Sequence, residues 1–169
     1  RLETEDLMIL FDGSGSEWEV EVDHVGKGSV LTTLISAVQP VPEPSVNVTM
    51  LLGLAKPERI ELAIQKCTEL GAIRFVPVTS ERVQGGNTGT PSPKRLERWQ
   101  RIAIEAAEQS GRAIVPTVES PMPVLEAVEQ AVETQPVLCM WEEVADQSRP
   151  LSAALRSLGS DSAEIANSM

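Results

Sequence analysis

The stretch PERIELAIQKCTELGAIRFVPV, residues 57–78, predicts a helix that is followed closely by a buried strand. Pro57 suits the first turn of a helix because that position needs no N–H donor, and Gly71 suits its end. Apolar side chains recur between them at helical spacing: Ile60, Ala63, Ile64, Cys67 and Leu70. We therefore predict a helix over residues 57–70 and a strand over residues 73–78.

Strands and helices alternate on both sides of this unit. The preceding segment VNVTMLLGL, residues 46–54, predicts a buried strand, and Ser92-Pro93 predicts the start of a long helix that ends before Gly111. Further elements are expected at residues 114–118 (strand), 123–132 (helix), 136–141 (strand) and 151–158 (a weaker helix). This alternation predicts an α/β fold with a mostly parallel sheet that is covered on both faces and has right-handed crossovers.

The first 37 residues have the pattern of β-structure. Turn signals occur at residues 12–15 and 26–28, and the segment EWEVEV, residues 17–22, alternates acidic and apolar side chains. We predict a small antiparallel sheet or part of a barrel, with further strands expected upstream. The proline-rich segment QPVPEPS, residues 39–45, is typical of a stiff linker and marks the expected domain boundary.

Composition excludes several classes of protein. The chain is 41% hydrophobic and 23% charged, which is ordinary for a globular protein, and it has no apolar run long enough to span a membrane. Cys67 and Cys139 lie in apolar patterns, so we expect buried free thiols in a reducing, cytoplasmic protein. His24 is the one histidine, which argues against a zinc site or a serine–histidine triad, and we expect no metal.

Charge is unevenly distributed along the chain. The net charge is −11, yet residues 56–112 hold ten of the fourteen Lys and Arg and only seven of the 25 Asp and Glu. Within the helix predicted over residues 93–110, Leu96, Trp99 and Ala103 fall on one side and Arg98, Arg101 and Glu105 on the other. Pairing at i,i+4, such as Glu97 with Arg101, explains that polar side by itself. A surface that grips a polyanion is the alternative.

Two motifs resemble a known family. The segments AIQKCTELGAIRFVPVTSERV, residues 63–83, and KRLERWQRIAIEAAEQSGRAIVPTV, residues 94–118, resemble the bacterial 16S rRNA (uracil-N3)-methyltransferase family of the RsmE type. That family belongs to the SPOUT class of knotted methyltransferases. The resemblance covers residues 51–118, and residues 6–22 resemble the end of the family's PUA-like RNA-binding barrel. It implies a cytoplasmic homodimer that uses S-adenosylmethionine to methylate N3 of a uridine in 16S rRNA of the small ribosomal subunit.

The resemblance also implies an organisation and a set of site residues. Residues 1–38 would be part of the PUA-like barrel, residues 39–45 the linker, and residues 46–169 part of the SPOUT α/β domain. Catalysis or base positioning would fall on Arg112, Glu105 and Gln109. RNA contact would fall on Ser80, Glu81, Arg82, Arg98, Arg101 and Ser110.

The family's cofactor signatures are absent from the sequence, so the S-adenosylmethionine site and the knot are expected beyond Met169. The chain is then expected to be truncated at both ends, to bind the cofactor poorly and to be inactive alone. Two alternatives stay open: a non-catalytic RNA-binding module, and an unrelated α/β domain whose ion-paired helix only mimics the motif.

Overall fold

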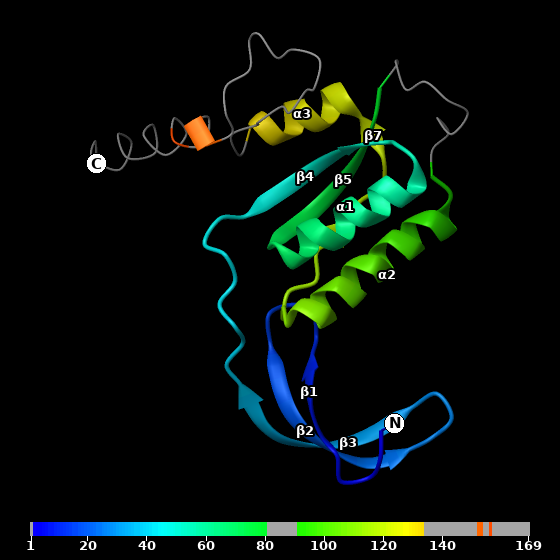
Figure 1. Cartoon of the computed structure of the whole chain (residues 1–169), viewed down its shortest axis with the longest axis vertical. Coiled ribbons are helices and arrows are strands. Elements are labelled where there is room, and N and C mark those ends of the chain that lie inside the picture. Colours follow the sequence, from blue (N-terminus) through cyan, green and yellow to red (C-terminus); the bar gives the residue numbers. More distant parts are fainter. Residues whose placement is uncertain (1, 81–90, 134–151, 154–155, 157–169) are drawn as a thin grey trace. The chain divides into compact units, whose positions relative to one another are not determined.

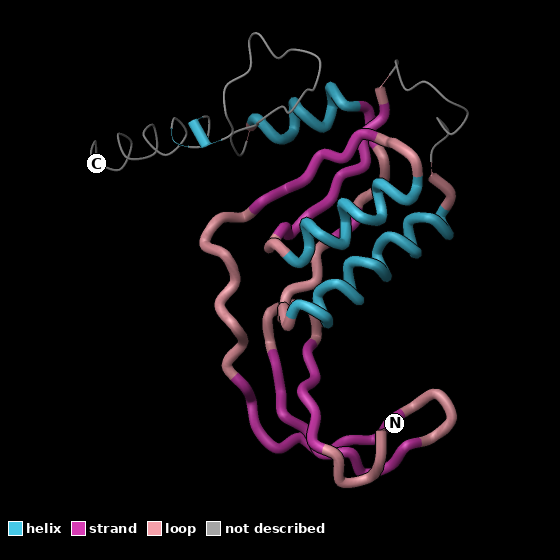
Figure 2. The backbone as a smooth tube through the Cα atoms, viewed as in Figure 1, coloured by secondary structure: helices cyan, strands magenta, loops and turns pink. Residues whose placement is uncertain are grey.

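The computed structural model describes residues 2–80, 91–133, 152, 153 and 156 of the chain (Figure 1). The chain divides into two compact units, residues 1–124 and residues 125–169, and each is described by itself. The three-stranded sheet, the proline-rich linker and most of the α/β part all lie in the first unit. Figure 2 distinguishes the helices, strands and loops of the described residues.

The chain begins with an antiparallel meander of three strands in the order β1-β2-β3. Its strands are β1 (Leu7–Phe11), β2 (Glu17–Val25) and β3 (Val30–Val38). Val20 and Val22 of β2 are buried on one face, as the alternating pattern predicts. Register shifts occur on both sides of Val20–Val22, where β2 pairs with β3, and the three strands form an open sheet in the described residues.

The second sheet is parallel and has β5 at its centre. Its strands are β4 (Val48–Gly53), β5 (Ala72–Thr79), β6 (Thr117–Val118) and β7 (Met122–Pro123). Both β6 and β7 pair with the side of β5 that β4 leaves open, at successive points along the strand. The predicted parallel sheet is therefore confirmed, and the predicted strands at residues 46–54, 73–78 and 114–118 match β4, β5 and β6 with small differences in their ends.

Helices α1 (Pro57–Glu69) and α2 (Pro93–Ser110) lie side by side against this sheet (Figure 1). Their inward side chains form one core with the sheet, and the fully buried members include Ile64, Phe75, Trp99 and Ala103. Val76 and Val78, which alternate with Phe75 along β5, are also buried, so this strand is covered on both faces. Helices α1 and α2 cover the face that carries Phe75, and coverage of the other face by helices stays a prediction.

Both helices end as the sequence predicts. Gly111 has a φ of 68° and Gly71 a φ of 102°, the left-handed region that a glycine adopts without steric cost. Backbone N–H groups at the ends of α1 and α2 donate to carbonyls one turn earlier, which satisfies part of each helix terminus.

The second unit holds nearly all of helix α3 (Val124–Val132), which agrees with the helix expected over residues 123–132. Ser152, Ala153 and Arg156 are helical, in agreement with the weaker helix expected there. The strand expected at residues 136–141, including Cys139, lies outside the described residues.

Candidate nucleic-acid interface

Helix α2 separates its side chains as the helical spacing predicts. Trp99, Ala103, Ala106 and Ala107 are buried against the core. The opposite side is exposed and polar, and it carries Lys94, Arg98, Arg101, Glu105 and Gln109. Because α2 has eighteen residues and a helix rises 1.5 Å per residue, this polar side extends over about 27 Å.

Arg98 holds an ion pair with the neighbouring helix rather than with its own. Its Nε and NH2 groups donate to the two carboxylate oxygens of Glu61 on α1, at 2.6 and 2.8 Å. This hydrogen bond lowers the pKa of Glu61 and raises that of Arg98. The Arg98 side chain remains 65% exposed, so part of its guanidinium faces solvent.

Arg101 differs from Arg98 because it has no salt bridge within the described residues, although Glu97 and Glu105 stand four residues away on either side. The predicted i,i+4 pairing of Arg101 is therefore wrong for this structure. An exposed guanidinium without a carboxylate partner is available to a phosphate, which it can contact with two donors.

Arg112 lies just beyond α2, and its side chain is only 8% exposed. The guanidinium donates to both carboxylate oxygens of Glu43, at 2.7 to 3.2 Å. NH1 also donates to the backbone carbonyls of Thr68 and Ala72, at 2.8 and 2.9 Å. Glu43 therefore holds this arginine, and neither Glu105 nor Gln109 is among its partners in the described residues. Its part in RNA contact or catalysis stays a prediction.

Ser110 is occupied locally. Its hydroxyl donates to the carbonyl of Ala106 at 2.7 Å and lies 3.3 Å from that of Ala107, so it bonds the last turn of its own helix. Glu105 and Gln109 are exposed on the polar side of α2. Contact of these three residues with RNA stays a prediction.

Of the first motif's Ser80-Glu81-Arg82 only Ser80 is described, and it lies at the opposite end of β5 from Arg112. Ser80 directly follows β5 at its carboxyl end, whereas Arg112 binds the carbonyl of Ala72, where β5 begins. Since a parallel strand rises about 3.3 Å per residue, the two ends are separated by about 26 Å. Glu81 and Arg82 lie outside the described residues. Ser80 and Arg112 are thus not neighbours within this chain.

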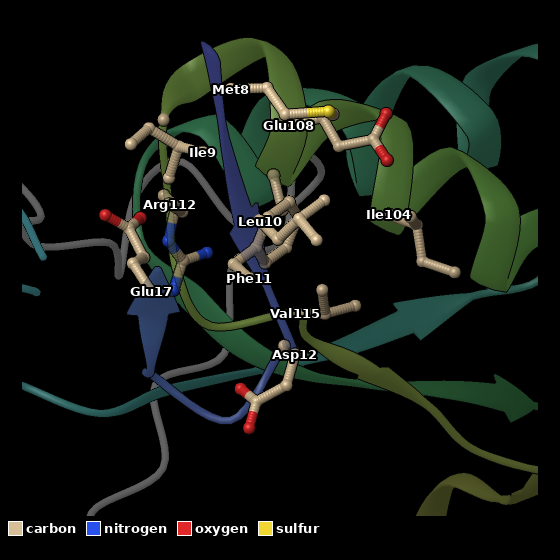
Figure 3. Close-up of a pocket in the computed structure, with 13 residues that line it drawn as sticks. Met8, Ile9, Leu10, Phe11, Asp12, Glu17, Ile104, Glu108, Arg112 and Val115 are labelled. Atoms are coloured by element: carbon tan, nitrogen blue, oxygen red, sulfur yellow. The ribbon is translucent and has the colours of Figure 1, made fainter. Parts of the chain in front are cut away.

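A pocket of about 700 Å³ lies between β1 and the end of α2 (Figure 3). Its wall from β1 is mostly apolar and includes Leu10 and Phe11, and Ile104 and Glu108 contribute from α2. Arg112 lines the same pocket, but four of its five N–H donors are engaged by Glu43 and the two carbonyls.

The described residues include neither a cluster of metal ligands nor a thiol with a lowered pKa. No group of His, Cys, Asp and Glu there could hold a metal ion. Cys67 is half-buried, and this burial raises the pKa of its thiol, so the reactive thiolate is disfavoured. None of the described helices has the length and apolar character that a membrane span requires.

A model of the RNA methyltransferase domain family matches residues 42–166. The chain belongs to this family. The match includes residues 42–45 of the linker and all of α1, β5 and α2, the three elements that carry most of both predicted motifs. It excludes the alternative of an unrelated α/β domain.

Curated relatives and solved structures agree with the family. The chain is 37% identical over 142 residues to ribosomal RNA small subunit methyltransferase E of Synechocystis sp., covering 83% of this chain and 45% of that protein. The Mycobacterium bovis protein of the same name is 32% identical over 160 residues, covering 91% and 60%. The Neisseria gonorrhoeae enzyme, solved bound to S-adenosyl methionine, superimposes with a TM-score of 0.72 at 31% identity, covering 78% of this chain and 54% of that one. The chain thus spans about half the length of these relatives.

Glu43 is the residue that the sequence did not reveal. It stands between two prolines in a segment that has the composition of a linker, and nothing in that pattern indicates a buried ion pair.

Proposed function

We propose that this chain is part of an S-adenosylmethionine-dependent methyltransferase that modifies N3 of a uridine in 16S rRNA of the small ribosomal subunit. The family match over residues 42–166 is the single observation that carries the proposal. We further propose that β1–β3 are part of a PUA-like barrel, that residues 39–45 link it to a SPOUT domain, and that the enzyme acts as a cytoplasmic homodimer.

The proposed reaction defines what the whole site must do. A methyl group passes from a sulfonium to the ring nitrogen N3, which carries a proton at neutral pH. The site must therefore remove that proton or stabilise the developing anion, and it must hold the base out of its stack.

We propose no contact with the cofactor for the described residues. Their buried polar side-chain atoms without a partner are Thr68 Oγ1 and Trp99 Nε1, and both residues lie inside α1 and α2 rather than at the carboxyl edge of the sheet. Ligands of parallel α/β sheets bind outside that edge. We therefore assign no catalytic step to the described residues and propose for them the binding of RNA.

The exposed side of α2 is the surface that we propose for RNA contact. Arg101 presents an unpaired guanidinium, and Arg98 is held in place by Glu61 with part of its fork exposed. Both arginines stand on a rigid helix whose other side is fixed in the core. A phosphate backbone gains charge-assisted hydrogen bonds from donors that are positioned in this way.

Salt-dependent binding tests this assignment in the full-length protein. Arg101→Ala should weaken binding to a 16S rRNA fragment and reduce the slope of log Kd against log salt by about 0.7 to 0.9, the value for one lost phosphate contact. Lys66→Ala is the matched control because Lys66 is an exposed cation on α1 that pairs with Glu69. An equal loss in both variants, or none in Arg101→Ala, would contradict the assignment.

A non-catalytic RNA-binding module is the second candidate. It needs only the arginine-bearing side of α2, which the described residues include. Calorimetric titration with S-adenosylmethionine discriminates the two when the 169-residue chain and the full-length protein are measured in parallel. Binding by the full-length protein supports the enzyme, and RNA binding with no cofactor binding in either supports the module.

A further inference from the structure

A short segment after α2, residues 111–115, contacts the three-stranded sheet, the linker and the α/β core. We call it the joint. Gly111 turns the chain at the end of α2, and the next four residues then run past the β1–β2 turn before β6 begins. The contact partners of the joint thus come from three parts of the first unit, namely the sheet, the linker and the core.

The first attachment joins the turn between β1 and β2 to the joint. The N–H of Gly15 donates to the carbonyl of Ala113, and the N–H of Val115 donates to that of Gly13, both at 3.0 Å. Ser14 and Ile114 form an isolated antiparallel bridge between these two bonds. A Cβ on Gly13 would lie 3.1 Å from a methyl of Val115, so the two backbones approach closely.

The turn is shaped for this contact by its own aspartate. The carboxylate of Asp12 accepts hydrogen bonds from the N–H and the hydroxyl of Ser14, each at 2.8 Å. The backbone bond from Ser14 is the main reason that the pKa of Asp12 is lowered. Such a turn holds its backbone ready to pair with a neighbouring strand.

The second attachment joins the linker to the joint through Arg112. The carboxylate of Glu43 is gripped by the guanidinium, while NH1 of the same group holds the carbonyls of Thr68 and Ala72. The neighbouring Pro44 packs so closely on Gly71 that a Cβ there would collide with the proline ring. The linker is thus bound to the α/β core, although its composition is that of a spacer.

Two attachments restrict the orientation of the three-stranded sheet more than one attachment does. A sheet that is held only at the β1–β2 turn can still rotate about that point. A second attachment at the same end of the sheet but beyond its opposite edge strand, where the chain leaves β3 and enters the linker, restricts this rotation. Arg112 supplies the second attachment, and because Glu43 and the two carbonyls engage its Nε–H, both NH1 hydrogens and one NH2 hydrogen, a two-donor contact with a phosphate would require release of the linker or of a carbonyl.

We propose that Arg112 is a positioning residue, which grips Glu43 of the linker and thereby fixes the three-stranded sheet relative to the RNA-facing side of α2. The consequence for RNA rests on the proposed function: one RNA contacts both parts, so their fixed placement lowers the entropic cost of binding.

Glu43→Gln tests the attachment with little disturbance of the core, because it keeps the shape of the side chain and leaves Arg112 bonded to both carbonyls. Glu43→Asp is the conservative variant, which keeps the charge. Glu119→Gln is the matched control, since it breaks the ion pair with Arg74, which does not involve the linker. Spin labels at Lys27, in the exposed β2–β3 turn, and at Glu97, exposed on α2, report the distance between the two parts.

The measurement uses the full-length protein with Cys67 and Cys139 replaced by alanine. We expect one narrow distance distribution for the reference protein and for Glu119→Gln, a broad one for Glu43→Gln and an intermediate one for Glu43→Asp. A distribution in Glu43→Gln as narrow as in the reference protein would overturn the proposal.

Methylation kinetics separate this proposal from the proposed function. We expect Glu43→Gln to raise KM for RNA about tenfold or less with kcat nearly unchanged, because the placement of the two surfaces changes and the chemistry does not. A fall of kcat in Glu43→Gln of the size expected for KM, with KM itself unchanged, would contradict a positioning role. A broadened distance distribution in a protein that neither binds nor methylates RNA would keep the positioning role and overturn the proposed function.

Discussion

The three-stranded sheet and the α/β part of the first unit differ in how much of their apolar surface is buried. Two helices cover the parallel sheet, and its central strand is buried on both faces. In the meander, Leu34 and Ile35 are neighbours on β3 at a register shift, and both are exposed, Leu34 by 62%. The burial that stabilises a fold is therefore concentrated in the α/β part.

This difference explains why the joint matters. A three-stranded sheet with little of its apolar surface covered gains little stability from its own packing. Its placement then depends on a few directed contacts, namely the paired backbones at the β1–β2 turn and the ion pair of Glu43. The α/β part needs no such contacts, because its helices are fixed by a continuous core.

Truncation of the Trp99 side chain should show most strongly that the α/β part is better packed than the meander. Trp99 is 1% exposed in the core between α1, α2 and the sheet. Trp99→Ala removes a large buried side chain and should lower the free energy of unfolding by about 3 to 5 kcal/mol. Leu34→Ala in the meander is the matched change at an exposed site and should alter it by no more than about 0.5 kcal/mol. Urea denaturation of both variants measures the difference.

Trp99→Phe sharpens this comparison. The indole N–H of Trp99 is buried without a hydrogen-bond partner, so its removal relieves part of the cost of burial. Trp99→Phe should therefore be much less destabilising than Trp99→Ala. Equal losses in Trp99→Ala and Leu34→Ala would show that the two regions are not packed as differently as the structure indicates.

Gly71→Ala should give the next largest loss of stability, because Gly71 lies where the linker packs on the core. Gly71 has a φ of 102°, and a Cβ there would collide with the ring of Pro44. Strain of this kind costs about 1 to 3 kcal/mol, and the linker must also move. Gly53→Ala is the matched control because no atom lies within 4 Å of its added Cβ. Thermal unfolding should show a clear fall in Tm for Gly71→Ala and a smaller one for Gly53→Ala.

The helices and strands were largely predictable from the sequence, because local signals determine them. Pro57, Gly71, Pro93 and Gly111 mark helix ends through backbone restrictions that do not depend on the rest of the protein. The strand β5 was predicted for the same reason, since its apolar run is bounded by turn signals. These elements lie in the region where tertiary packing agrees with local preference.

The site was less predictable because its contacts join residues that are distant in the sequence. Arg112 and Glu43 are 69 residues apart, and no periodic pattern relates them. The exposed position of Arg101 followed from helical spacing, but its lack of an ion pair did not. Electrostatic partners depend on which helix lies beside which, and Arg98 accordingly pairs with Glu61 of α1 rather than with its own helix.

The ion pair between Glu61 and Arg98 should give the smallest effect, visible in the pH dependence of stability. Its hydrogen bond from Arg98 lowers the pKa of Glu61 in the folded state, so the folded protein binds a proton there less readily than the unfolded chain. The contribution is therefore present above the ordinary glutamate pKa and is lost as the pH falls through the lowered pKa. Glu61→Gln should reduce Tm slightly at neutral pH and match the parent protein at a pH below both values. Because the pair is solvent-exposed, a large difference at neutral pH, or one that persists in acid, would mean that Glu61 acts through packing against α2 and not through its charge.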